Sequence, residues 1–337
     1  MSEPLSPGTT LWSRYHIVEL VAKGGQGSIY KAEDLRLSGR LCAIKEVITD
    51  IGASKSYQEQ IQAQFHREAN VLARLDHPNL PKVSDFFLYN GRDYLVMDFV
   101  SGRDLREKIE EAKVKGVHIT EKKVLEWAKQ ILDALIYLHS QDPPILHRDI
   151  KPANIKLTES GPLKLVDFGL VKVMAPDDDR TVTVLQGKGT VQYTPLEQYG
   201  GDTGHTDARS DIYSLGATLF HLLALRPPTE AKERFLYPNK QLSLREFNPS
   251  VSSKTEQAIL HALAMHPDER PATAADFNEE LLKGRSFALM GANSDWWLQL
   301  HNVQSALLEN KTLLAVVGLL LALAMIVTFF APTLPQP

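Results

Sequence analysis

The stretch that decides the fold reads His147-Arg148-Asp149-Ile150-Lys151-Pro152-Ala153-Asn154, and Asp167-Phe168-Gly169 begins thirteen positions after Asn154. Either piece alone is short enough to occur by chance. Together, in this order and at this spacing, they form a specific signature of a catalytic loop. The lysine two positions after Asp149 and the asparagine five positions after it belong to that signature. We therefore expect this loop to carry the chemistry of the protein.

The residue types suit the transfer of a phosphoryl group from a nucleotide. That reaction needs an attacking hydroxyl held in line with the phosphorus, and it needs the phosphate charge neutralised. The carboxylate of Asp149 can accept the hydroxyl proton, and Lys151 can place a positive charge beside the moving group. Asn154 and Asp167 supply the hard oxygen ligands that Mg²⁺ prefers. The simpler interpretation, that Asp149 caps a turn, accounts for only one member of the set.

Apolar periodicity on either side of this loop predicts two lobes of different composition. Upstream, short alternating segments rich in β-branched residues predict strands at 16–24, 27–34, 41–47 and 94–100. One helix is predicted from apolar positions 61, 65, 69, 72 and 75, and it ends before Pro78. Downstream, apolar stripes predict long helices over 124–138 and 212–223. The expected fold is α+β, with a β-rich lobe and a helical lobe that contains the catalytic loop.

With these motifs in place, the chain resembles the eukaryotic-like (Hanks-type) serine/threonine protein kinases, particularly the membrane-bound bacterial members. The resemblance covers residues 15–282. It implies a bilobal protein kinase fold and an ATP-dependent transfer of phosphate to Ser and Thr hydroxyls of proteins, with autophosphorylation. It also implies that Asp149 is the catalytic base and that Asn154 and Asp167 are ligands of Mg²⁺ or Mn²⁺. Lys151, counted with Asp149 and Asn154 as catalytic, is typical of the serine/threonine branch.

The resemblance places the nucleotide site in the β-rich lobe. Residues 22–30 resemble the glycine-rich hairpin over the phosphates, with Ala22 where the first glycine is usual. A positive φ at Ala22 would be costly because alanine carries a Cβ. Strand alternation puts Ala43 and Lys45 on one face, and Glu68 is the expected ion-pair partner of Lys45. The implied ATP-binding residues are Ala22, Gly24, Gly25, Gly27, Ile29, Ala43, Lys45, Glu68, Met97, Asp98 and Val100.

Two elements downstream resemble the part of a kinase that receives the protein substrate. Gly189-Thr190 is similar to the substrate-positioning loop, and residues 194–197 are similar to its terminal Ala-Pro-Glu element. The resemblance implies structural roles for three further residues: Glu197 pairs with Arg270, and Asp211 braces the catalytic loop.

Thr181 and Thr183 lie between Asp167 and Glu197, and Arg148 directly precedes the catalytic aspartate. In the family this arrangement goes with activation by a phosphate on the loop. Autophosphorylation is therefore predicted at Thr181 or Thr183. The alternative is that both are ordinary loop threonines.

Composition limits the remaining possibilities. The chain has 337 residues, a formal charge of −4 and no basic block, so we expect no nucleic-acid partner. Cys42 is the only cysteine, which excludes an internal disulfide and a cysteine-rich metal site.

The C-terminal part predicts a membrane anchor. Residues 312–330 are uncharged and long enough to span a bilayer, although a buried core helix would also be apolar. Lys311 on the near flank points to a cytoplasmic kinase domain with a single-pass C-terminal anchor. Because only the seven residues 331–337 follow this run, we expect no sensor domain beyond the membrane.

Between domain and anchor, residues 285–311 place Trp296 and Trp297 on an apolar stripe. Three interpretations stay open: an interfacial membrane helix, a helix packed on the large lobe, or the seam of a homodimer. The expected boundaries are a tail at 1–10, a kinase domain at 11–284 with lobes 11–97 and 101–284, a juxtamembrane segment at 285–311, a span at 312–330 and a tail at 331–337.

Two other functions compete with that of an active protein kinase. A membrane-anchored pseudokinase scaffold would be expected to lack at least one residue of the catalytic set. None is missing, since the chain retains Lys45, Glu68, Asp149, Asn154 and Asp167. A small-molecule kinase of the same fold fits less well, because Gly189-Thr190 and residues 194–197 suit a peptide substrate. The expected partners are ATP, a divalent metal, protein substrates and a membrane.

Overall fold

The computed structural model describes residues 3–24, 27–47, 55–159, 161–167, 191–199, 206–237 and 242–283, without the side chains of 55–61 and 64. Several predicted features lie outside these ranges: Gly25, Phe168, Gly169, Thr181, Thr183, Gly189, Thr190, the juxtamembrane segment 285–311 and the predicted span 312–330. Within the described ranges, no helix has both the length and the apolar character that crossing a bilayer requires.

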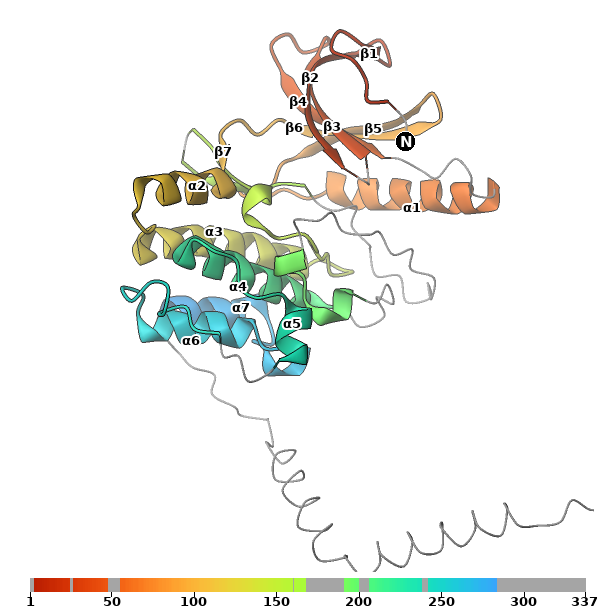
Figure 1. Ribbon diagram of the computed structural model, residues 1–337. Coiled ribbons are helices and arrows are strands. Elements are labelled where there is room, and N and C mark those ends of the chain that lie inside the picture. The colour runs from red at the N-terminus through yellow and green to blue at the C-terminus, as the bar shows by residue number, and fades with distance from the viewer. Residues whose placement is uncertain are drawn as a thin grey trace, which may run out of the picture. The chain divides into compact units, whose positions relative to one another are not determined.

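A six-stranded antiparallel sheet forms the N-lobe, with the strand order β1-β2-β3-β4-β6-β5 (Figure 1). The predicted strands 27–34 and 41–47 are confirmed with the same bounds, and buried positions alternate along β3 as expected for a half-buried strand. The strands are β1 (Thr10–Leu11), β2 (Tyr15–Gly24), β3 (Gly27–Asp34), β4 (Leu41–Val47), β5 (Val83–Tyr89) and β6 (Arg92–Asp98).

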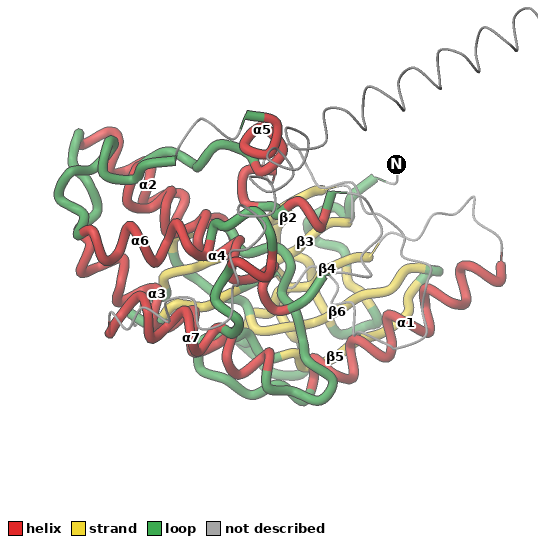
Figure 2. Tube along the Cα trace, turned by 90° about the horizontal axis from the view of Figure 1, so that it is seen from below, coloured by secondary structure: helices red, strands yellow, loops and turns green. Residues whose placement is uncertain are grey.

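Helix α1 (Lys55–Ala73) packs against β5 and β6 and runs beside β5 in the view from below (Figure 2). It ends two residues before Leu75, which the predicted stripe had included. Leu75 is nevertheless buried, because the chain turns back so that its N–H donates to the carbonyl of Leu72. The predicted break before Pro78 is confirmed.

The C-lobe is built from helices whose ends are marked in the sequence. Helix α2 begins with a capping box between Asp104 and Glu107 and ends at Gly116, which adopts the left-handed conformation. Helix α3 begins at Thr120, whose hydroxyl accepts from the backbone of Lys123. The helices are α2 (Leu105–Lys115), α3 (Glu121–His139), α4 (Ala208–Ala224), α5 (Ala231–Leu236), α6 (Ser253–Ala262) and α7 (Ala274–Asn278).

Helix α4 lies at the centre of the C-lobe, in contact with α2, α3, α6 and α7. Every residue from Ser210 to Ala224 is buried, so this helix has no solvent face. Gly216 permits the close approach of α6, since a Cβ there would lie 3.0 Å from the Cβ of Ala262. The central position of α4 makes it a support for the loops around it.

A small second sheet frames the catalytic loop. Its strands are β7 (Arg103–Asp104), β8 (Ile155–Leu157) and β9 (Leu163–Leu165), in the order β7-β8-β9. Strand β8 starts directly after Asn154, and β9 ends two residues before Asp167, so the hairpin brings the two motifs together. Gly102 precedes β7 with φ +116°, and a Cβ there would overlap the carbonyl oxygen of Leu157.

One hydrophobic cluster runs through both lobes. It joins Phe65 of α1 and Met97 of β6 to α3 and α4 residues such as Leu135 and Leu219. A second cluster fills the outer part of the N-lobe around Tyr15 and Tyr30. The lobes are thus joined by shared core as well as by the chain segment that follows Asp98.

Candidate active site

The catalytic loop holds Asp149 in a defined position. Its Oδ2 accepts from Lys151 Nζ at 2.7 Å and from Asn154 Nδ2 at 2.9 Å. Asn154 Nδ2 also donates to the backbone carbonyl of Asp149 at 2.8 Å. The other carboxylate oxygen, Oδ1, is buried and has no hydrogen-bond partner among the described residues. Asp149 therefore presents one neutralised oxygen and one oxygen that can still accept a hydrogen bond.

Asp211 of α4 braces this loop, as predicted. Its carboxylate accepts from the backbone N–H groups of His147 at 2.8 Å and Arg148 at 2.7 Å. Arg148 has φ +64°, a conformation that costs energy for a residue with a Cβ and that these contacts help to hold. Burial alone would raise the pKa of Asp211, but the hydrogen bond to His139 and the neighbouring His147 outweigh it, so the pKa is lowered. The brace is therefore an anion.

Asp167 meets the lysine of the N-lobe. Lys45 Nζ of β4 lies 2.5 Å from Asp167 Oδ1. Burial would raise the pKa of Asp167, but Lys45 more than offsets it, so the pKa stays below its usual value. The N–H of Val166 donates to the carbonyl of Asn154 at 2.8 Å, which fixes Asp167 beside the catalytic loop. Two motifs separated by 122 residues thus meet in one site.

Glu68 is buried in α1, two residues beyond His66, and the charge of Glu68 acts on the guanidinium of Arg148. Burial lowers the pKa of Arg148, while Asp211 and Glu68 raise it. The predicted Lys45–Glu68 ion pair stays a prediction. Lys45 and Glu68 are both buried.

The hairpin of β2 and β3 carries the residues predicted to cover the phosphates. Ala22 lies opposite Ile29, and Gly24 lies opposite Gly27. Ala22 is not among the residues with positive φ, so the cost expected for alanine at this position does not arise. Gly27 has φ +141°, and a Cβ there would overlap the carbonyl oxygen of Glu46. The position in this hairpin that requires a glycine is therefore Gly27 and not Ala22.

Strand pairing brings the next predicted nucleotide residues together. Ala43 of β4 lies opposite Met97 of β6, and Lys45 lies opposite Ile29 of β3. Asp98 ends β6, and its N–H donates to the carbonyl of Lys82 at 3.0 Å. Apart from Glu68 on α1, the predicted nucleotide residues in the described ranges therefore lie on adjoining strands and on the segment that follows them, through Val100.

The predicted substrate segment runs from Gly189 to Glu197. The structure describes it from Val191 onward, within the range 191–199. Glu197 accepts from Arg270 Nη1 at 2.6 Å and from Arg270 Nη2 at 3.0 Å, which confirms the predicted pair. Ser210 Oγ of α4 donates to Glu197 at 2.7 Å. Burial would raise the pKa of Glu197, but Arg270 reverses the effect and the pKa is lowered.

Some contacts of this site carry no signal in the sequence. Tyr193 of the turn Val191–Tyr193 lies 2.6 Å from Nδ1 of His221. Asn79, after α1, donates to the carbonyl of Leu163 at 2.8 Å, and Gln130 of α3 accepts from the N–H of Leu163 at 2.9 Å. These partners are far apart in the chain and follow no local pattern, so only the fold brings them together.

The donor set fits a divalent metal held together with a nucleotide. Within the described ranges no group of three or more His, Cys, Asp and Glu side chains forms a metal centre. Mg²⁺ needs only one or two protein oxygen ligands when phosphates and water complete its shell. The anionic Asp167 fits that role. Asn154 fits it too, because Nδ2 points to Asp149 and Oδ1 points away from it.

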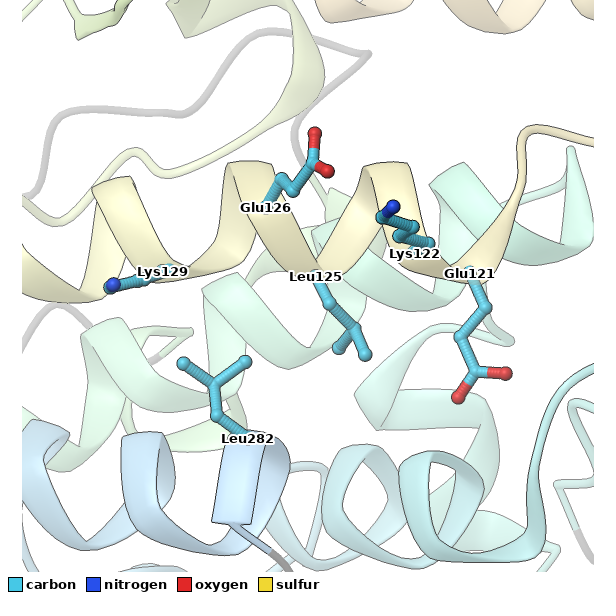
Figure 3. A pocket seen from close by; sticks show the side chains of 6 residues that line it. All are labelled: Glu121, Lys122, Leu125, Glu126, Lys129 and Leu282. Carbon is cyan, nitrogen blue, oxygen red and sulfur yellow. The ribbon is translucent and has the colours of Figure 1, made fainter.

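A surface pocket lies apart from these residues, between α3 and the last described turn of the C-lobe. Leu125 of α3 and Leu282 approach one another there, while Glu126 points away (Figure 3). The pocket is lined by Glu121, Lys122, Leu125, Glu126, Lys129 and Leu282. None of these is a predicted site residue.

The fold, the catalytic loop and the Lys45–Asp167 contact define a kinase-type catalytic domain. The family model for the protein kinase domain matches residues 15–283, and the chain belongs to this family. The predicted bilobal fold and the predicted family are both confirmed.

Among curated relatives, the chain is 34% identical over 295 residues to a probable serine/threonine-protein kinase, SCO3848, of Streptomyces coelicolor, covering 83% of this chain and 41% of the relative. It is 33% identical to the serine/threonine-protein kinase PrkC of Bacillus subtilis, covering 81% of this chain and 41% of PrkC. The chain thus spans about two fifths of the length of these relatives. Among solved structures, the PknI kinase domain of Mycobacterium tuberculosis superposes with a TM-score of 0.63 at 26% identity, covering 83% of this chain and 99% of that domain.

Proposed function

We propose that this protein is an ATP-dependent serine/threonine protein kinase. The observation that carries the proposal is the hydrogen bonding of the two carboxylate oxygens of Asp149. Lys151 and Asn154 neutralise and fix its Oδ2, while Oδ1 is buried without a partner among the described residues. A desolvated carboxylate oxygen with no donor is costly. The arrangement is explained if the donor is the hydroxyl of a protein substrate.

The reaction follows from this geometry. The Ser or Thr hydroxyl oxygen attacks the γ-phosphorus of ATP, and its proton passes to Asp149. A new P–O bond forms to the substrate as the bond between the γ-phosphorus and the β,γ-bridging oxygen breaks, which releases ADP. Lys151 lies 2.7 Å from Asp149, so its charge stands beside the transferred group. Lys45 supplies a second positive charge from the N-lobe.

Asn154 and Asp167 are the residues that would hold the divalent metal. When bound, Mg²⁺ or Mn²⁺ would neutralise charge on the phosphates. The chain contributes the placement of these ligands: the Val166 N–H holds Asn154, and the left-handed conformation of Asp167, with φ +59°, turns its side chain toward Lys45.

The test compares wild type with Asp149→Asn. We expect radiolabelled γ-phosphate to pass to myelin basic protein only with wild type, in the presence of Mg²⁺. Asparagine has the same shape but cannot take the proton, so the rate should fall by at least about a hundredfold. Equal transfer by the two proteins would refute the catalytic assignment.

We also propose that the loop before Glu197 is autophosphorylated at Thr181 or Thr183. Arg148 supports this, because its Nε is buried and has no partner among the described residues. Mass spectrometry of protein incubated with ATP and Mg²⁺ should find phosphate on one of these threonines in wild type and on neither in Asp149→Asn. Unmodified threonines in active protein would contradict the proposal.

A membrane location is the last part of the proposal. It rests on the uncharged run 312–330 and on Lys311 beside it. We expect the full chain to sediment with membranes after a carbonate wash, and a chain truncated after Lys283 to stay in the supernatant. Equal distribution of both would contradict the anchor.

A further inference from the structure

A buried hydrogen bond ties the turn Val191–Tyr193 to the middle of the C-lobe. The hydroxyl of Tyr193 lies 2.6 Å from Nδ1 of His221 on α4, and both side chains are buried. Their rings also stack, with centroids 6.1 Å apart. The two residues are 28 positions apart in the chain. The contact therefore fixes the turn against α4 instead of folding it on itself.

The pair is uncharged around neutral pH. Burial lowers the pKa of His221 to about 4, with Lys113 of α2 adding to the shift and Glu110 of α2 opposing it. Burial raises the pKa of Tyr193 above that of a free phenol, against the charge of Arg106. A neutral imidazole and a neutral phenol can share one hydrogen. The hydrogen bond between Tyr193 and His221 can therefore form at neutral pH.

Packing alone does not explain a histidine at this position. Nε2 of His221 is buried and has no hydrogen-bond partner among the described residues. An unsatisfied buried nitrogen lowers stability, and an apolar side chain of similar size would avoid that loss. What the imidazole adds is the partner for Tyr193.

The same helix also holds the catalytic loop. Asp211 in the first turn of α4 accepts from the N–H groups of residues 147–148, and Thr218 Oγ1 donates to the carbonyl of Ile150 at 3.4 Å. His221 lies three residues beyond Thr218, about one turn along α4. One helix, buried from Ser210 to Ala224, therefore supports both the loop that carries Asp149 and the turn that carries Tyr193.

We propose that His221 is a positioning residue for the protein substrate: through Tyr193 it holds segment 191–197 at a fixed place relative to Asp149. An acceptor bound on this segment then brings its hydroxyl to the base. This inference rests on the proposed kinase function and adds the contact that sets acceptor binding. Loss of the bond should impair acceptor capture and leave nucleotide binding unchanged.

The test measures steady-state transfer from ATP to myelin basic protein by the full chain. Tyr193→Phe and His221→Leu should each raise KM for the acceptor about five- to tenfold, the effect of one neutral hydrogen bond. KM for ATP and the slow hydrolysis of ATP by water should stay within about twofold. The double variant should be no worse than either single variant, because the same bond is lost.

Two further variants separate positioning from a general structural effect. His221→Gln keeps an amide that can bond the phenol and should restore most of the acceptor KM. His118→Leu is the matched control, since His118 Nδ1 lies 3.1 Å from the carbonyl of Leu223 near the end of α4 and contacts the helix backbone instead of Tyr193. Its acceptor KM should equal that of wild type.

The outcomes are distinguishable. An unchanged acceptor KM in Tyr193→Phe, or a parallel rise in KM for ATP, overturns the positioning role. The proposed kinase function stands in that case, provided wild type transfers more phosphate than Asp149→Asn. Absence of transfer by wild type overturns the kinase function itself.

Discussion

The guanidinium of Arg270 donates to both carboxylate oxygens of Glu197, at 2.6 and 3.0 Å. The side chain of Arg270 is 0% exposed and that of Glu197 is 9% exposed. The remaining donors of Arg270 reach the carbonyls of Ala264, Met265 and Arg209. The pair thus joins the end of the substrate segment to the loop before α7. It is a satisfied ion pair inside the protein and not a surface contact.

Removal of one partner should leave a buried charge. Glu197→Gln is expected to lower the free energy of unfolding by about 3–5 kcal/mol, measured by urea denaturation. Lys283→Met is the control, because the Lys283–Glu279 pair is solvent-exposed and should matter by less than about 1 kcal/mol. Similar values for the two variants would show that the buried pair contributes no more than an exposed one.

The brace from Asp211 should affect catalysis more than stability. Asp211→Asn keeps one acceptor oxygen but gives up the charge that holds the backbone of His147 and Arg148. We expect kcat to fall at least about tenfold, since hydrogen bonds to a charged group contribute about 1.5–3 kcal/mol. KM for ATP should change little. A variant with wild-type kcat would exclude a role in holding the loop.

Gly102 should tolerate no side chain. It combines φ +116° with a backbone oxygen, that of Leu157, where a Cβ would lie. Gly102→Ala is expected to destabilise the protein by about 2–3 kcal/mol, because the β7–β8 contact must shift. Gly116→Ala separates the two causes, since Gly116 has φ +65° but open space around it. That variant should cost only about 1 kcal/mol.

The depressed pKa of His221 predicts a pH dependence of stability. His221 protonates near pH 4 in the folded protein and near 6.5 in the unfolded chain. The unfolded chain therefore binds more protons between these values, and stability rises with pH in that window. The contribution is complete above about pH 6.5 and is lost as the pH falls toward 4.

Wild type should accordingly lose on the order of 2 kcal/mol more than His221→Gln between pH 7 and 4.5. Urea denaturation at both pH values for the two proteins gives this difference directly. Parallel losses would show that His221 does not resist protonation in the folded state.

The sequence predicts most elements for clear physical reasons. Strands β3 and β4 alternate in polarity, and α3 buries the predicted stripe of Val124, Trp127, Ala128, Ile131, Leu135 and Leu138. The sequence predicts no strand at β5, where Ser84 and Asp85 interrupt the apolar residues. The carboxylate of Asp85 accepts from Arg14 and Tyr15 there, at 3.0 and 2.7 Å. Those partners are about 70 residues away, beyond any local pattern.

The residues of the candidate site likewise fall into those that the sequence predicts and those that it does not. Asp149, Lys151 and Asn154 could be predicted because their chemistry depends on spacing within one loop. Tyr193 and His221 could not, since neither belongs to a motif and their contact depends on how the turn 191–193 meets α4. Residues whose role depends on a tertiary contact can be identified only once the structure is known.

The burial of α4 from Ser210 to Ala224 has a consequence for how the protein unfolds. A helix with no solvent face has no separate fraying route, so its amide hydrogens should exchange with deuterium only when the C-lobe unfolds as a whole. The catalytic loop and the turn Val191–Tyr193 are both hydrogen-bonded to this helix. The C-lobe should therefore have no partly unfolded state that keeps one of them in place and loses the other, and enzymatic competence should disappear in a single cooperative step.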